Sequence, residues 1–260
     1  MKILIGGDVV GKPGRKACAE VIPQIKREEK IDFVIINAEN AAGGSGITEA
    51  TTEELFGCGI DCLTTGDHVF KKKEAEQLIQ EDHRILRPAN FPSMVPGEGK
   101  GIYQTRTGIK IGVINLIGRV FLKTVECPFE TARKLVEELR NKVDIIVVDF
   151  HAEATSEKIA MGWYLDGKVS GIFGTHTHVQ TADETILPQG TAYITDVGMC
   201  GPYKSIIGRD IESVLHMFIT QMPARFEMAK DDVRFSGVIF EMDLDEKRAV
   251  SVKRIHRRVE

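Results

Sequence analysis

The sequence predicts an α/β protein built around a largely parallel sheet. Short runs rich in Ile, Val and Leu alternate with segments of helical periodicity, which is typical of consecutive βαβ units. Acidic and histidine residues follow these runs, at the strand ends where open α/β sheets bind their ligands. With 260 residues, 42% of them hydrophobic, the chain suffices for one large core, and no repeat or linker divides it. We therefore expect a single domain over residues 1–260.

The first part of the chain contains three predicted strand–helix pairs. The expected strands are Lys2–Ile5, Asp32–Ile36 and Cys62–Thr65, and the expected helices are Arg15–Glu29, Glu49–Phe56 and Lys71–Glu81. The stretch Arg87–Lys100 contains Pro88, Pro92 and Pro96, which are incompatible with a regular helix or a central strand. A long loop or small flap is expected there, around residues 85–105.

The second part begins with a predicted hairpin. Gly101–Arg106 and Lys110–Leu116 alternate in polarity on either side of a Thr-Gly turn. Further strands are expected at Asp144–Val148, Gly171–Phe173 and Ala192–Thr195, and helices at Phe129–Asn141, Glu157–Trp163 and Ile211–Thr220. The last two alternating runs, Arg234–Asp243 and Arg248–Ile255, predict antiparallel strands that complete a second sheet.

Composition limits the classes of partner. The formal net charge is −4, so no global basic field favours stable nucleic-acid binding, while a small anionic substrate stays compatible. No apolar stretch approaches membrane-spanning length, and the N-terminus lacks the pattern of a signal peptide. The five cysteines are odd in number and lack CxxC spacing, which favours free thiols in a reducing compartment. We expect a cytoplasmic protein without membrane contact, and self-association into a homo-oligomer stays open.

Potential metal ligands follow the predicted strands in short clusters. They are Asp8, Glu39, Asn40, Asp67, His151, His176 and His178. Any one cluster alone would most simply be explained by ordinary hydrogen bonding. The whole set is different, because carboxylates, imidazoles and an amide can neutralise two divalent cations and still leave positions open for water and substrate. The absence of paired cysteine ligands argues against a structural zinc site. The pattern predicts a two-metal hydrolase.

Two details refine this prediction. His68 directly follows Asp67 and can stay free of metal, which suits an imidazole that protonates a leaving oxygen. His176 and His178 form an HxH pair at a strand end, where alternate side chains could reach adjacent metals.

A rival interpretation starts from Gly6–Lys12, which matches the first seven positions of the phosphate-binding GxxxxGK loop. The match fails at Pro13, which replaces the Ser or Thr that holds magnesium, and Asp8 would place a carboxylate inside a cradle of backbone donors. An NTPase of this kind would depend on Lys12. In the hydrolase interpretation Lys12 and Arg15 attract phosphate or simply form a solvated helix terminus.

The motifs together resemble the calcineurin-type metallophosphoesterases, and in particular their YmdB-like branch. The matching segments are Gly7–Gly11, Glu39–Gly44, Thr65–Gly66, Asp149–Ala154, Gly174–Gln180 and Tyr193–Met199. The resemblance implies a four-layer α/β/β/α sandwich and a phosphodiesterase that hydrolyses cyclic nucleotides, with 2′,3′-cyclic nucleotides favoured. It also implies attack by a metal-bridging hydroxide with His68 as the proton donor.

The resemblance further implies two divalent or mixed-valence metal ions, with iron favoured and manganese or magnesium as substitutes. The first metal would be bound by Asp8, Glu39, Asn40 and His178, and the second by Glu39, Asp67, His151 and His176. The chain departs from the family at Asp67, where relatives carry Asn, so a negative charge is added beside the phosphate. This departure keeps open an alternative function, a nucleotide-sensing regulatory protein on the same scaffold with weak turnover.

Overall fold

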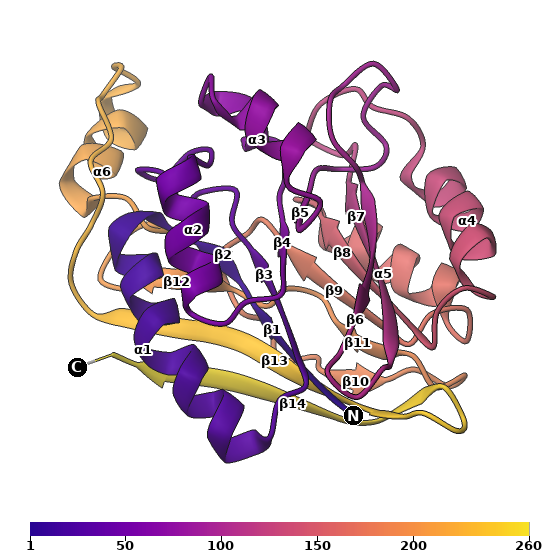
Figure 1. The fold of residues 1–260 in the computed structure, drawn as a ribbon. Coiled ribbons are helices and arrows are strands. Elements are labelled where there is room, and N and C mark those ends of the chain that lie inside the picture. Colours follow the sequence, from indigo (N-terminus) through magenta and orange to yellow (C-terminus); the bar gives the residue numbers. More distant parts are fainter. Residues whose placement is uncertain (260) are drawn as a thin grey trace.

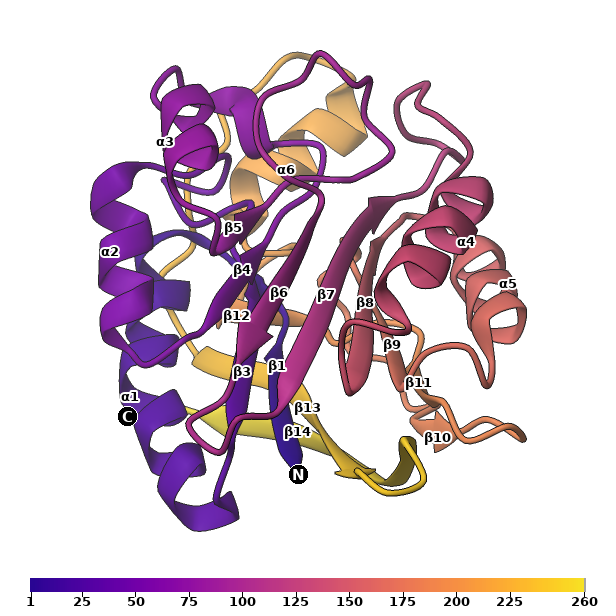
Figure 2. The same cartoon turned by 45° about the vertical axis from the view of Figure 1, so that its right-hand side comes forward.

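The computed structural model describes residues 1–259 as a mixed α/β fold with two sheets (Figures 1 and 2). The eight-stranded first sheet contains β1 (Lys2–Gly6), β2 (Asp8–Val9), β3 (Phe33–Asn37), β4 (Cys62–Thr64), β5 (Ile85–Leu86), β12 (Met199–Pro202), β13 (Val233–Asp243) and β14 (Arg248–Arg258). The six-stranded second sheet contains β6 (Lys100–Gln104), β7 (Lys110–Ile117), β8 (Ile145–His151), β9 (Gly171–Thr175), β10 (Thr185–Ile186) and β11 (Ala192–Ile194).

Helices connect the strands of both sheets. They are α1 (Gly11–Glu29), α2 (Glu49–Gly57), α3 (Ala75–Glu81), α4 (Pro128–Leu139), α5 (Thr155–Leu165) and α6 (Ile211–Thr220), with a short 3-10 helix at Val69–Lys71. The strands β1, β3, β4 and β5 are parallel neighbours, and so are β7, β8, β9 and β11. A parallel pair needs a long crossover, which explains the helices between successive strands. The predicted βαβ alternation is confirmed.

Three groups of buried apolar side chains hold these elements together. Ile25 of α1 packs against the first sheet, and Met161 of α5 packs against the second. Phe173 and Phe240 lie in a third group, which includes residues of both sheets. Figure 2 shows α1 and α2 beside the first sheet and α4 and α5 beside the second. A strand that is covered on both faces has a continuous apolar run in its sequence. β3 is an example, because every residue of Phe33–Asn37 is buried.

The C-terminal pair of strands was assigned wrongly from the sequence. β13 and β14 pair antiparallel, as expected, but β13 also pairs antiparallel with β1, so both strands belong to the first sheet. The second sheet is completed by β6, β10 and β11 instead. Alternation along a strand indicates which face is buried, but it contains no information about the neighbour across a long sequence separation.

Smaller differences have local causes. α1 begins at Gly11, four residues earlier than expected, because Pro13 is tolerated in a first helical turn that needs no internal N–H donor. The predicted helix over Lys71–Glu81 is divided because Lys72 is extended, with φ −105° and ψ 136°. The short strands β2, β5, β10 and β12 were not expected.

The predicted loop is confirmed. The proline-containing stretch at 87–99 has neither helix nor strand, and the cysteines are unpaired. Within the described residues, no helix combines the length and the apolar character that a membrane span requires.

The packing around Phe240 generates a stability prediction. Phe240 is fully buried, and its ring contacts the Cα side of Gly171, so Phe240→Ala would leave a cavity. We expect the free energy of unfolding to fall by about 3–5 kcal/mol. Val250→Ala is the control. Val250 on β14 is 51% exposed, so this substitution should change the free energy of unfolding by less than about 0.5 kcal/mol. Urea denaturation followed by circular dichroism measures both, and equal midpoints for the two variants would contradict this account of the core.

Candidate metal centre

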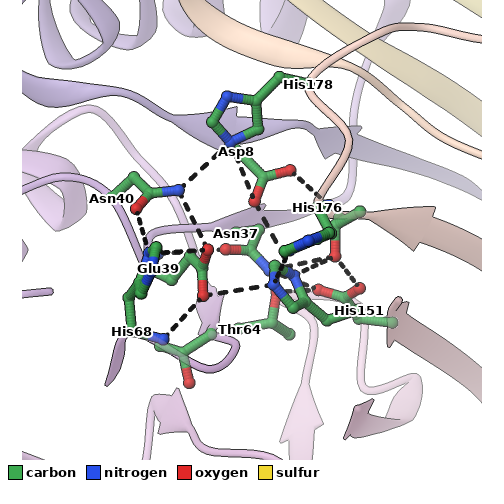
Figure 3. A network of polar contacts seen from close by, with 12 residues as sticks. Asp8, Asn37, Glu39, Asn40, Thr64, His68, His151, His176 and His178 are labelled. Carbon is green, nitrogen blue, oxygen red and sulfur yellow. Dashed lines mark hydrogen bonds and ion pairs between the residues drawn. The ribbon is translucent and has the colours of Figure 1, made fainter. Parts of the chain in front are cut away.

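The candidate ligands meet where the carboxyl ends of strands from both sheets come together (Figure 3). Asp8 begins β2 directly after the turn at the end of β1, Glu39 and Asn40 follow β3, and Asp67 follows β4. From the second sheet, His151 ends β8, while His176 and His178 follow β9. Ligand sites in open α/β sheets lie at these strand ends, so the position agrees with the sequence prediction.

Four residues form a compact group that could hold a metal ion. Glu39, Asp67, His151 and His176 each present one ligand atom, and these atoms lie within 4.8 Å of one another. His151 Nε2 lies 3.3 Å from Glu39 Oε2, 3.5 Å from Asp67 Oδ1 and 3.0 Å from His176 Nδ1. These four residues are the set that the family resemblance implied for the second metal.

The other candidate ligands, Asp8, Asn40 and His178, lie beside this group. His178 Nε2 lies 4.0 Å from Asp8 Oδ1 and 3.3 Å from Asn40 Nδ2. Asn40 Nδ2 donates to Glu39 Oε1 at 3.0 Å, whereas Glu39 Oε2 faces His151. One carboxylate thus contacts both groups, which is the position that a bridging ligand requires. As a ligand, Asn40 would need a half-turn of its amide, which would exchange Nδ2 for Oδ1.

Two of the imidazoles have one ring nitrogen held by a protein acceptor and the other directed toward the cluster. Thr175 Oγ1 donates to Asp149, so His151 Nδ1 donates to Thr175 Oγ1 at 2.9 Å and Nε2 faces Glu39. His178 Nδ1 donates to the carbonyl oxygen of Ile207 at 2.9 Å, which leaves Nε2 free. Such contacts fix the tautomer and the ring orientation of metal-binding histidines.

His176 completes the set of imidazoles. Its Nε2 lies 3.1 Å from Glu153 Oε2, while its Nδ1 faces Asp67 and His151. A carboxylate on the outer nitrogen favours a proton there and leaves Nδ1 for a cation.

Two buried carboxylate oxygens test whether a cation fits here. Asp8 Oδ1 and Asp67 Oδ1 are buried, and neither has a hydrogen-bond partner within the described part of the chain. A buried carboxylate oxygen is costly unless a hydrogen bond, a charge or a metal ion compensates it. Both oxygens point toward imidazole nitrogens at 3.5–4.0 Å, so a cation between them would satisfy both kinds of donor atom. Mixed carboxylate and imidazole ligands suit first-row divalent metals.

The electrostatics of the cluster also favour a bound cation. Burial raises the pKa of Asp8 to about 7, although the charge on His151 partly opposes this shift. Burial lowers the pKa of His176 to about 4, and His151 adds to the effect. Burial also opposes a charge on His151, but the carboxylate of Glu39 raises the pKa of His151 well above its usual value. Protonated His151 therefore compensates the carboxylates, and a bound cation would displace its proton.

A buried polar network supports His151 from behind. Asp149 accepts hydrogen bonds from Thr64 Oγ1 at 2.5 Å, Thr175 Oγ1 at 2.8 Å and Asn37 Nδ2 at 3.1 Å. Burial raises the pKa of Asp149 to about 7, and the charge of His151 and the hydroxyl donors of Thr64 and Thr175 oppose the shift. The sequence analysis did not assign a role to Asn37, Thr64 or Thr175. Their position just before the predicted ligands was the only available signal.

A pocket of about 340 Å³ opens above the cluster. It is lined by Val10, Glu39, Asn40, Gly44, His68, Glu153, His176, Thr177, His178, Ile207 and Arg209. The sequence analysis missed Glu153 and Arg209. Glu153 lies two residues after His151 and could have been found, whereas Arg209 reaches the pocket from a distant turn without a local signal.

Two expectations about nearby residues need adjustment. His176 and His178 do not alternate along a strand; they lie in the bend after β9 with φ values of 101° and 65°. Arg15 is bound to Glu54 and to the carbonyl oxygen of Ala41, away from the pocket lining. Lys12, on which the NTPase interpretation depended, is exposed and does not line this pocket either.

The fold and the site define an α/β enzyme of the phosphodiesterase class with a candidate metal centre at its strand ends. A model of the YmdB-like protein family matches residues 4–255, so the chain belongs to this family. It is 49% identical to the 2′,3′-cyclic-nucleotide 2′-phosphodiesterase of Bacillus subtilis (strain 168), over 98% of this chain and 96% of that protein.

Two solved structures are similar along almost the whole chain. A hypothetical protein from Thermus thermophilus has a TM-score of 0.93 and 38% identity, with 99% of each chain covered. A novel phosphatase from Mycoplasma pneumoniae has a TM-score of 0.93 and 36% identity, covering 99% of this chain and 93% of that one. The family resemblance drawn from the motifs is confirmed.

Gly66 offers a test of the site that removes no ligand. A Cβ atom at Gly66 would lie 2.2 Å from His151 Nε2 and 2.3 Å from Glu39 Oε2, so Gly66→Ala would displace both side chains. We expect metal affinity to fall roughly 10- to 100-fold, as it does when supporting residues of metal sites are changed. Metal content after dialysis against graded chelator measures this loss. Gly57→Ala is the control, because a Cβ there meets nothing within 4 Å. Equal metal retention in both variants would contradict the site.

Proposed function

We propose that the protein is a dinuclear-metal phosphodiesterase that hydrolyses cyclic nucleotides, with 2′,3′-cyclic nucleotides favoured. The observation that carries this proposal is the Glu39 carboxylate, which contacts two groups of potential ligands beneath a pocket that His68 also lines. The name of the Bacillus subtilis relative supports the substrate class.

The proposed scaffold is a single domain with the four-layer α/β/β/α sandwich of metallophosphoesterases. Three groups of buried apolar residues support it, one shared by the two sheets and one between each sheet and its helices. The shared group would keep the carboxyl ends of both sheets close enough for one site.

In this proposal Asp8, Glu39, Asn40 and His178 bind one metal, and Glu39, Asp67, His151 and His176 bind the other. Iron is the favoured metal, with manganese or magnesium as substitutes. When bound, the cations would acidify water and neutralise charge that develops on the phosphoryl group. The carboxylates of Asp8, Glu39 and Asp67 leave two divalent cations with a net positive charge, which suits a monoanionic phosphodiester.

His68 is the proposed proton donor to the departing ribose oxygen. It lines the pocket, its side chain is 33% exposed, and it lies outside the compact group of four ligands. Its Nδ1 lies 3.0 Å from Asn40 Oδ1. As a general acid His68 would donate the Nε2 proton of its imidazolium form, which leaves a neutral ring after the transfer.

Metal analysis followed by a substrate panel tests the proposal as a whole. Manganese- or iron-loaded protein should contain two metals per chain and hydrolyse 2′,3′-cyclic nucleotides faster than 3′,5′-cyclic nucleotides. Removal of metal with a chelator should abolish turnover, and readdition should restore it, because the ions supply the charge stabilisation. Two bound metals with negligible turnover on every cyclic nucleotide would refute the enzyme and support the nucleotide-sensing alternative.

The role of His68 is separable from metal binding. His68→Ala should keep both metals but lose about 10²- to 10⁴-fold in kcat on nucleotide substrates, whose leaving oxygen needs a proton. The loss should be much smaller with a nitrophenyl phosphodiester, because nitrophenolate departs without protonation. His216→Ala, an exposed substitution on α6, is the control. If His68→Ala releases metal, His68 is a ligand and its proposed role is wrong.

Asp67 is the residue at which this chain departs from the family pattern. Burial opposes its charge, but the close contact with His151 and the charge of that ring bring the pKa of Asp67 below its usual range, so it acts as an anion. Asp67→Asn should weaken metal retention, while the fully loaded variant should turn over at least as fast and be inhibited more strongly by phosphate, since repulsion is reduced. Turnover and phosphate inhibition at saturating manganese measure both effects. A loaded variant that is slower and no more phosphate-sensitive would instead give Asp67 a catalytic task, such as orienting His68, whose Nε2 lies 3.5 Å from Asp67 Oδ2.

A further inference from the structure

A tight turn at Ile206–Arg209 forms one side of the pocket. The backbone N–H groups of Ile206 and Arg209 each donate to the carbonyl oxygen of the other residue, at 2.9 and 3.0 Å. Ile207 has φ 45° and Gly208 has φ 96°. The left-handed conformation is unfavourable for a β-branched residue such as Ile207 and persists only where tertiary contacts hold it. The turn is therefore a constrained part of the site.

Contacts connect this turn to the candidate metal centre. The carbonyl oxygen of Ile207 accepts the hydrogen bond from His178 Nδ1. Arg209 Nη2 donates to the carbonyl oxygen of Gly44 at 2.6 Å, and Gly44 N donates to the carbonyl oxygen of Asn40 at 3.1 Å. The turn thus holds a side chain that lines the pocket next to two proposed ligands.

The charge of Arg209 is uncompensated. Its guanidinium is half-buried and contacts neutral acceptors, the Gly44 carbonyl and Met228 Sδ at 3.2 Å. Among residues 1–259 no carboxylate forms an ion pair with it, and burial alone lowers its pKa. Arginines elsewhere, such as Arg15 with Glu54, do pair with carboxylates. A partly desolvated cation without an acidic partner is suited to an anionic ligand.

We propose that Arg209 is a substrate-binding residue that donates hydrogen bonds to a non-bridging phosphoryl oxygen of the phosphodiester held at the candidate metal centre. This inference rests on the proposed function for the identity of its ligand. A guanidinium has five N–H donors in a planar fork, so donors remain for phosphate beyond those used on Gly44 and Met228.

The charge pattern of the pocket fits this role. Glu153, with a side chain that is 48% exposed, lines the same pocket and lies beside His176. Arg209 lies with Ile207, whose carbonyl binds His178. Arg209 attracts anions and Glu153 repels them. A phosphodiester bound here would therefore direct its charged oxygens toward Arg209 and its neutral ribose toward Glu153. Arg209 would therefore orient the substrate as well as attract it.

Inorganic phosphate is the probe that tests this inference without turnover. Calorimetry on manganese-saturated protein should show that Arg209→Gln raises the Kd of phosphate roughly 10- to 100-fold, as expected for loss of a charge-assisted hydrogen bond. Arg209→Lys should recover part of the affinity, because it keeps the charge but not the fork. Bound manganese should be unchanged in both variants.

Two control variants separate this role from bulk charge and from structure. Lys204→Gln removes one exposed positive charge near Arg209 in the sequence but outside the pocket lining, and should keep the wild-type affinity for phosphate. Met228→Leu removes the sulfur acceptor of Arg209 but keeps the guanidinium, so the affinity for phosphate should again equal that of the wild type.

Several results would overturn the inference. They are a phosphate affinity of Arg209→Gln within about twofold of wild type, an equal loss in Met228→Leu, and loss of manganese together with phosphate. Absence of phosphate binding by the loaded wild-type protein would also overturn it. Hydrolysis of cyclic nucleotides by the wild type is scored separately. If turnover is absent while Arg209→Gln still loses phosphate, the proposed function fails and the role of Arg209 in anion binding stands.

Discussion

The Asp149 carboxylate joins the two sheets at the end where the candidate metal centre lies. It is fully buried on β8 of the second sheet and accepts hydrogen bonds from Asn37 and Thr64, which belong to β3 and β4 of the first sheet. A buried carboxylate is tolerated only when donors surround it, so these bonds restrict how the strand ends can lie relative to one another. Thr175 extends the network to His151, which thereby acquires both its tautomer and its direction.

A second buried charge stabilises the segment after β9. Asp196 pairs with Lys158 at 2.6 Å, and both side chains are buried. The same carboxylate accepts hydrogen bonds from the backbone and the hydroxyl of Thr177. Thr177 lies between His176 and His178, which both have positive φ, a conformation that costs free energy in residues other than glycine. The Lys158–Asp196 pair compensates this strain and presents both imidazoles to the carboxylates of the first sheet.

The pocket combines these rigid supports with groups of opposite charge. Glu39 and the imidazoles form its floor, His68 and Arg209 supply donors, and Glu153 adds a negative charge. Each group comes from a different connection after a strand or before a helix. Such a site can distinguish substrates through its loops while the ligand geometry stays fixed by the sheets.

The sequence by itself determined the βαβ alternation, the loop at 87–99 and the residues that follow each strand. These features are local, because apolar periodicity and proline positions depend on near neighbours in the chain. All seven candidate ligands and His68 could therefore be named from the sequence, since the carboxyl ends of parallel strands share one edge.

Only the tertiary structure decided which strands are neighbours and which distant residues complete the site. β13 and β14 join the first sheet because β13 pairs with β1, at a separation of more than two hundred residues that alternation does not encode. The cross-sheet bonds of Asp149 depend on how two sheets face each other. Arg209 reaches Gly44 through a turn whose left-handed Ile207 has no sequence signal. Pairing over long separations is selected by the packing of the whole chain, and local patterns do not contain it.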